Sequence, residues 1–168
     1  MIIALPFDSA FDTILGLPVH PLVVHAVVVL IPLTALGAIA IALVPRWSRR
    51  FGVLVVLGAL GGTGAAFVAE RSGKQLASRV GYPETHGNLG EKEKWFAAAL
   101  LLVVAVLWWW DRKHAEQPRT TAVKILAAVV IVVALAATGW TIRTGHTGSQ
   151  VVYEQIIKST TPGQFPGH

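Results

Sequence analysis

Four long apolar segments limit what this chain of 168 residues can fold into. They cover about residues 21–44, 51–69, 92–110 and 122–142. About 20 apolar residues in a helix cross a hydrocarbon core about 30 Å thick. Charged residues make up 14% of the chain, whereas a soluble domain has about 25%. We therefore predict an all-α membrane protein with four transmembrane helices in an antiparallel bundle.

The net charge of +5 has a one-sided distribution along the chain. The segments between the first two and the last two apolar runs hold only two acids, Asp111 and Glu116. Together with Lys124 at the start of the fourth run, they hold seven basic residues: Arg46, Arg49, Arg50, Arg112, Lys113, Arg119 and Lys124. Because basic segments stay in the cytoplasm, we expect a multi-pass protein of the inner (plasma) membrane with both termini outside. The basic excess orients the protein, and we expect no nucleic-acid partner.

We expect three regions in the chain. Residues 1–18 form an extracytoplasmic segment, either a helix lying at the membrane interface or a partly ordered tail. Residues 19–158 form the transmembrane domain, and residues 159–168 form an extended tail rich in proline and glycine. The chain has no cysteine, which excludes disulfides, thiolate ligands, c-type haem attachment and cysteine-bound iron–sulfur clusters.

Four of the six histidines fall at the same end of the predicted bundle. His20 and His25 begin the first apolar segment, His86 lies in the expected loop before the third, and His146 follows the fourth. Ionisable groups at a membrane boundary are costly unless something pairs with them. Neutral imidazole is also the commonest protein ligand for transition metals. The four histidines therefore predict a metal or haem site at this end; amphipathic anchoring at the interface is the plainer alternative.

His25 and His146 are the leading ligand candidates within this set. Five residues of helix place His20 and His25 roughly 140° apart, so both cannot face one ion from a regular helix. His25 lies inside the apolar run, where an unpaired imidazole costs more. Gly145 and Gly148 flank His146 and would permit a tight turn close to a bound group.

The identity of the metal is left open by the residues. Two facing histidines beside a smooth glycine-rich helix (Gly58 to Gly64) favour haem b, although close helix packing is the commoner use of such a face. Three or four imidazoles on one ion would favour copper or zinc. Nearby acids such as Glu70 and Glu84 could add a ligand or pair with surface cations. No nucleophile–base set or phosphate-binding loop appears, so no enzyme activity is assigned.

Three short motifs carry a resemblance to a known family. They are LPVHPLVVH at residues 17–25, THGNL at 85–89, and GHTG at 145–148 with Val152 and Tyr153 beyond it. The chain thereby resembles the bacterial four-span membrane family called domain of unknown function 2231. The resemblance implies that His20, His25, His86 and His146 are the family's marked positions. It also implies a respiratory or redox setting.

Our leading functional hypothesis is a cytochrome b-like electron-transfer or accessory subunit of a respiratory complex, with a histidine-bound haem near the outer face. A copper or zinc site for metal handling or assembly is the second hypothesis. A cofactor-free structural subunit is the third. The expected partners are membrane lipid, a larger membrane redox complex or further copies of the chain, and quinone.

Overall fold

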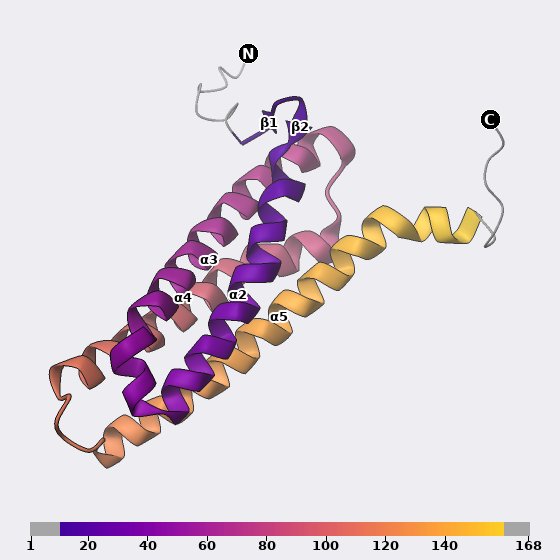
Figure 1. Ribbon diagram of the computed structural model, residues 1–168. Helices are drawn as coiled ribbons and strands as arrows, with labels where there is room; N and C mark the ends of the chain where they lie inside the picture. Colours follow the sequence, from indigo (N-terminus) through magenta and orange to yellow (C-terminus); the bar gives the residue numbers. More distant parts are fainter. Residues whose placement is uncertain (1–10, 160–168) are drawn as a thin grey trace.

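Four long helices make up the computed structural model, which describes residues 11–159 apart from the side chains of residues 155 and 156. They are α2 (Val19–Leu43), α3 (Pro45–Val80), α4 (Glu84–Lys113) and α5 (Thr121–Ser159). Two short antiparallel strands, β1 (Thr13–Ile14) and β2 (Leu17–Pro18), precede them. Each helix is long and apolar enough to cross a membrane. The predicted all-α, four-span architecture is therefore confirmed (Figure 1).

The helices form a closed ring in which each packs against two neighbours. α2 contacts α3 and α5, and α4 contacts the same two helices from the opposite side. The first and fourth spans are therefore neighbours. Aliphatic side chains fill the centre, among them Ile31, Leu100, Val104 and Val130. Their outward-facing counterparts, such as Leu36 and Leu102, are exposed, as lipid-facing side chains must be.

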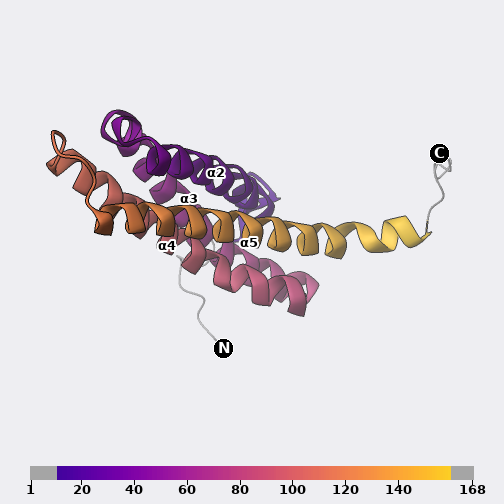
Figure 2. The ribbon, with the colours of Figure 1, turned by 90° about the horizontal axis from the view of Figure 1, so that it is seen from below.

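The two ends of the bundle differ in chemistry. We call one the histidine end: it comprises the β hairpin, the turn between α3 and α4, and residues 144–154 of α5. The other, the arginine end, comprises residues 43–52 and 108–124. Figures 1 and 2 show α5 running the whole length of the bundle and projecting past its neighbours at the histidine end.

A buried ion pair closes the arginine end. The side chains of Arg119 and Asp111 are 8% and 3% exposed, and Arg119 Nη2 donates to Asp111 Oδ2 over 2.6 Å. The same guanidinium donates to the carbonyls of Ile41 and Ala42 in the last turn of α2. Those carbonyls lack partners within the helix, as the last carbonyls of any helix do. Arg119 therefore joins the ends of α2 and α4 to the segment that leads into α5.

The glycine-rich face of α3 packs against α2. A Cβ at Gly58 would lie 2.7 Å from Thr34 Oγ1, and one at Gly62 would lie 3.3 Å from Ile31 Cγ1. Small residues at this spacing let two backbones approach closely. The helix-packing interpretation of this face is confirmed, and α2 occupies the space that a flat macrocycle would need.

The structure corrects several local predictions at the histidine end. α4 begins at Glu84, so His86 lies in a first helical turn and the loop expected at this position is wrong. α5 continues to Ser159 without a turn at Gly145 or Gly148. Glycine lowers helix stability by only about 1 kcal/mol, which neighbouring turns and tertiary packing can outweigh.

The N-terminal prediction is corrected in part as well. Residues 13–18 form the β hairpin, with positive φ angles at Leu15 and Gly16 in its turn, and no interfacial helix lies within residues 11–18. The earlier part of that segment, residues 1–10, lies outside the described residues. So does the predicted tail from residue 160 onward; residue 159 itself is still in α5.

Candidate functional site

Two of the four histidines that we expected to bind a metal or haem lie close to each other at the histidine end. His20 is the second residue of α2 and His86 the third of α4, and both rings are half-buried. Their ring centroids are 6.1 Å apart, with an angle of 70° between the ring planes. The two imidazoles come from helices on opposite sides of the ring of four, so they meet across the mouth of the bundle.

Backbone carbonyls fix the orientation of both rings. His20 Nδ1 lies 2.9 Å from the Ala69 carbonyl oxygen of α3, and His86 Nδ1 lies 3.1 Å from that of Thr144 in α5. A carbonyl oxygen only accepts, so each Nδ1 carries a proton and each neutral ring keeps a bare Nε2. Within the described residues neither Nε2 has a hydrogen-bond partner. This arrangement, with one nitrogen anchored and the other free, is typical of metal-binding histidine.

Each ring of the pair lies against a glycine. A Cβ at Gly73 would lie 3.0 Å from His20 Cε1, and one at Gly148 would lie 2.9 Å from His86 Cε1. Any larger residue at either position would displace a ring. Gly148, predicted to lie close to a bound group, therefore supports His86 from within a continuous helix. The contact between Gly73 and His20 could not be predicted from the sequence, because the two residues are 53 positions apart and Gly73 belongs to no motif.

The structure does not bring His25 and His146 into this pair. Both are exposed, and neither makes a ring contact with another histidine in the part of the chain described. His25 Nδ1 lies 2.5 Å from the Pro21 carbonyl oxygen one turn earlier in the same helix, so its Nε2 is also free. A Cβ at Gly145 would meet only Val28 Cγ1, at 3.9 Å, so this glycine does not lie against a histidine ring as Gly73 and Gly148 do.

The protein supplies only part of a ligand set at the histidine end. Across residues 11–159, no three His, Asp or Glu side chains lie close enough together to hold a metal ion. The pair His20 and His86 could provide two imidazole ligands, and further ligands would have to come from water, another chain or a cofactor.

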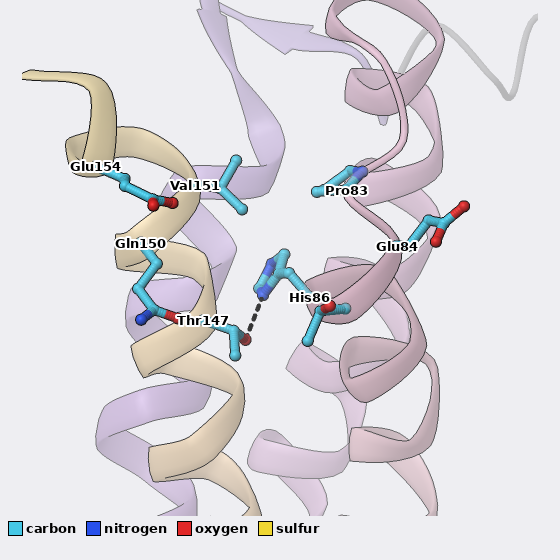
Figure 3. Close-up of a pocket in the computed structure, with 8 residues that line it drawn as sticks. Pro83, Glu84, His86, Thr147, Gln150, Val151 and Glu154 are labelled. Carbon is cyan, nitrogen blue, oxygen red and sulfur yellow. Dashed lines mark hydrogen bonds between the residues drawn. The ribbon is translucent and has the colours of Figure 1, made fainter. Parts of the chain in front are cut away.

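A pocket of about 270 Å³ opens beside His86, between the start of α4 and the last turns of α5. Its lining is Pro83, Glu84, Thr85, His86, Thr147, Gln150, Val151 and Glu154. Figure 3 shows the His86 ring pointing across the gap toward Thr147, 3.4 Å from Nδ1 to Oγ1. The Glu84 carboxylate turns to the other side of α4, away from the ring (Figure 3). The pocket thus gives solvent a route to the edge of the histidine pair.

Glu70 acts as an ion-pair partner at this end. Its carboxylate accepts from Lys74, one turn later in α3, over 2.9 Å, and from Lys94 of α4. The plainer alternative weighed for Glu70, pairing with nearby cations, is confirmed, with Lys94 as an unforeseen partner. A carboxylate bound by two ammonium groups is a poor additional metal ligand. Lys94 also lies 5.7 Å from the Phe67 ring centroid, which strengthens the contact between α3 and α4.

Glu93 is a buried acid in the third turn of α4 that the sequence motifs did not single out. It is 5% exposed and belongs to the buried face of α4 with Leu89 and Ala97, four residues on either side. Its Oε1 lies 2.5 Å from Thr141 Oγ1, while Oε2 is buried with no partner in the described residues. The spacing of four residues to apolar neighbours on both sides could have indicated this burial.

These features define a four-span membrane protein with a pair of carbonyl-anchored imidazoles at one end of its bundle. The chain belongs to the predicted membrane protein family DUF2231, which matches residues 16–161. That range includes all four helices, and the resemblance carried by the three motifs is thereby confirmed. No curated protein and no solved structure matches the chain.

Proposed function

We propose that this protein is a membrane metalloprotein in which His20 and His86 bind one transition-metal ion at the histidine end. The observation that carries the proposal is the paired anchoring of the two rings by backbone carbonyls, 6.1 Å apart. Anchored Nδ1 atoms reduce the rotational freedom that binding would otherwise remove, and they fix Nε2 as the coordinating atom. Imidazole suits zinc, copper and iron alike.

The physiological role we propose is electron transfer or metal handling as an accessory subunit of a membrane complex. Two imidazoles leave coordination positions open, and open positions suit a site that exchanges a ligand or an electron with a partner. A larger redox complex, a second copy of the chain and quinone are the partners we propose. The pocket beside His86 supports access to the site from the same end.

Haem b is a second candidate for the bound group. His20 and His86, with 6.1 Å between their ring centroids, would hold its iron, and the iron would supply electron-transfer chemistry. His25 and His146 are the alternative haem ligands, but their exposed rings would need a cofactor or another subunit to cover them.

We also propose that the histidine end faces outward from the plasma membrane. The arginine end holds seven basic residues against two acids, and positive segments remain in the cytoplasm. Both described ends of the chain, near residues 11 and 159, then lie on the outer side.

Metal and haem content of the purified protein tests the proposal. Elemental analysis and a reduced-minus-oxidised absorption spectrum would be recorded for the wild type and for His20→Ala and His86→Ala. We expect about one bound ion per chain in the wild type, and a loss of at least tenfold in affinity in either variant, since even an outer partner of a ligand contributes 10–100-fold. A haem b spectrum lost in the same variants would select the second candidate.

His114→Ala is the matched control for these variants. Its Nδ1 lies 3.2 Å from the Trp110 carbonyl oxygen, so its ring is anchored like those of His20 and His86. It lies at the arginine end, with no second histidine beside it among the described residues. Unchanged metal content in all three variants would overturn the proposal and favour a structural subunit. Loss confined to His25→Ala and His146→Ala would move the site to those residues.

A further inference from the structure

Glu93 is the one buried acid in the described part of the chain that has no cationic partner. It shares the inward face of α4 with Asp111, eighteen residues further along. Asp111 is bound by Arg119 over 2.6 Å, whereas Glu93 is in no ion pair within residues 11–159. An ionised carboxylate buried without a cation is far more costly than the neutral acid. The two acids on this face therefore differ in their partners: Asp111 has a cation and Glu93 has none among the described residues.

The hydrogen bonds around Glu93 favour the neutral acid. Thr141 Oγ1 has one proton and lies 3.0 Å from the Ala137 carbonyl oxygen and 2.5 Å from Glu93 Oε1. If Glu93 were ionised, that single proton could serve only one of the two acceptors. If Glu93 is protonated, its hydroxyl donates to Thr141 and Thr141 donates to Ala137, so both bonds form. The unpartnered Oε2 is then a carbonyl oxygen, which is cheaper to bury than a carboxylate oxygen.

The charged groups near Glu93 do not offer it a counter-charge. Lys94, next to it in sequence, is bound to Glu70 of α3. Lys92 on α4 and Arg143 on α5 are exposed. α2 contains no Asp, Glu, Lys or Arg, and His86 lies two helical turns above on α4. The surroundings are otherwise the apolar core and the indole of Trp140, which stacks on Phe96 with 4.5 Å between ring centroids.

Three threonine hydroxyl groups of α5 lie between Glu93 and the pocket at the histidine end. Thr141, Thr144 and Thr147 recur every three residues, so each step rises about 4.5 Å along the helix axis. Thr141 contacts Glu93, and Thr147 lines the pocket next to His86. Each of the three hydroxyls donates to a carbonyl three or four residues earlier in α5. Side-chain hydroxyls both donate and accept, so rotation of these groups lets them pass a proton toward the pocket.

We propose that Glu93 is a proton-binding site inside the bundle: it rests as the neutral acid, donates to Thr141, and exchanges its proton with the histidine-end pocket along the seam between α4 and α5. Intramembrane acids of this kind mark proton pathways in other membrane proteins. The proposal does not depend on a metal at His20 and His86. It gives the protein a group that can take up or release a proton out of contact with lipid.

Infrared spectroscopy of the full chain in lipid, in H₂O and in D₂O, tests the proposal. We expect the carbonyl-stretch band of a protonated carboxylic acid at neutral pH, shifted in D₂O and abolished in Glu93→Gln. Glu91→Gln, which alters an acid two residues away that pairs with Lys74, is the matched control and should keep the band. A band of an ionised carboxylate that disappears only in Glu93→Gln would overturn the proposal.

Two further variants keep the proposal testable if Glu93→Gln fails to fold. Thr141→Val leaves Glu93 in place but removes its hydrogen-bond acceptor, so the carbonyl-stretch band should shift. Thr144→Val should slow the exchange of the Glu93 proton for deuterium several-fold, whereas Thr138→Val, on the far side of Thr141, should not. A band that never shifts in D₂O, or equal exchange in both threonine variants, would refute exchange along the seam.

Discussion

At the scale of single residues, the position of His86 depends on the absence of a side chain at Gly148. A Cβ there would lie 2.9 Å from His86 Cε1, and the ring cannot move without loosening its bond to the Thr144 carbonyl. We expect Gly148→Ala to lower metal affinity by about tenfold or more, the effect of disturbing a ligand's outer partner. Competition with a chromophoric chelator would measure it.

Gly139→Ala, in the same helix, is the control for this substitution. A Cβ at Gly139 meets nothing within 4 Å, so metal affinity should be unchanged and helix stability should rise slightly. Equal metal affinity in the Gly148 and Gly139 variants would contradict the conclusion that Gly148 leaves room for the His86 ring.

The sequence identified candidate residues more reliably than it predicted whether their side chains face the interior or the surface of the bundle. The sequence identified His20 and His86 as members of a set of four, but ranked His25 and His146 above them. That ranking assumed that a histidine within an apolar run must be covered by protein. His25 instead bonds its own helix backbone and faces outward. The burial of Glu93 was missed although Leu89 and Ala97, four positions away on either side, indicate it, whereas its hydrogen-bond partner Thr141, 48 positions away, could not be predicted from the sequence.

At the scale of helices, the contact between α3 and α4 depends on a glycine at position 52. An added Cβ at Gly52 would overlap the Trp108 indole ring. We expect Gly52→Ala to lower the free energy of unfolding by about 1–3 kcal/mol, the usual cost of overpacking. Thermal unfolding in detergent, followed by circular dichroism, would measure the change.

Gly64→Ala provides the comparison within the same helix. Nothing lies within 4 Å of a Cβ at Gly64, so the substitution should be neutral or stabilising by up to about 1 kcal/mol. A Gly52 variant as stable as the Gly64 variant would show that Trp108 repacks without cost.

Apolar runs predicted which parts of the helices lie in lipid but not where the helices end. Hydropathy follows contact with hydrocarbon, and α3, α4 and α5 all continue beyond it through polar residues. α3 continues past Glu70 to Val80, because the sequence has no helix breaker before Gly81. The glycine at 148 misled because it accommodates the His86 ring rather than a turn.

At the scale of the whole molecule, the buried pair of Asp111 and Arg119 holds the arginine end together. Asp111→Asn would leave the guanidinium, 8% exposed, without its counter-ion. Removing one partner of a buried pair costs about 3–5 kcal/mol. We expect a corresponding fall in unfolding free energy, measured by denaturant titration in detergent. Glu154→Gln, which breaks the exposed pair with Lys158, should change stability by less than about 1 kcal/mol.

The absence of cysteine makes the orientation of the protein directly measurable. Tyr82→Cys places a single thiol at the exposed turn of the histidine end, and Glu116→Cys places one in the exposed loop at the arginine end. We expect a membrane-impermeant maleimide to label only the first in intact cells and both after lysis. Labelling of the second alone in intact cells would reverse the proposed topology.

The unequal closure of the two ends has a consequence for how the molecule moves. The arginine end is held by a guanidinium that makes four hydrogen bonds to three groups. The histidine end is held by imidazole-to-carbonyl contacts and by ion pairs with partly exposed partners. Thermal fluctuations will therefore separate the helices at the histidine end before they separate them at the arginine end. If the proposals above hold, an ion or a proton would enter at the histidine end, while the arginine end keeps the four helices in register.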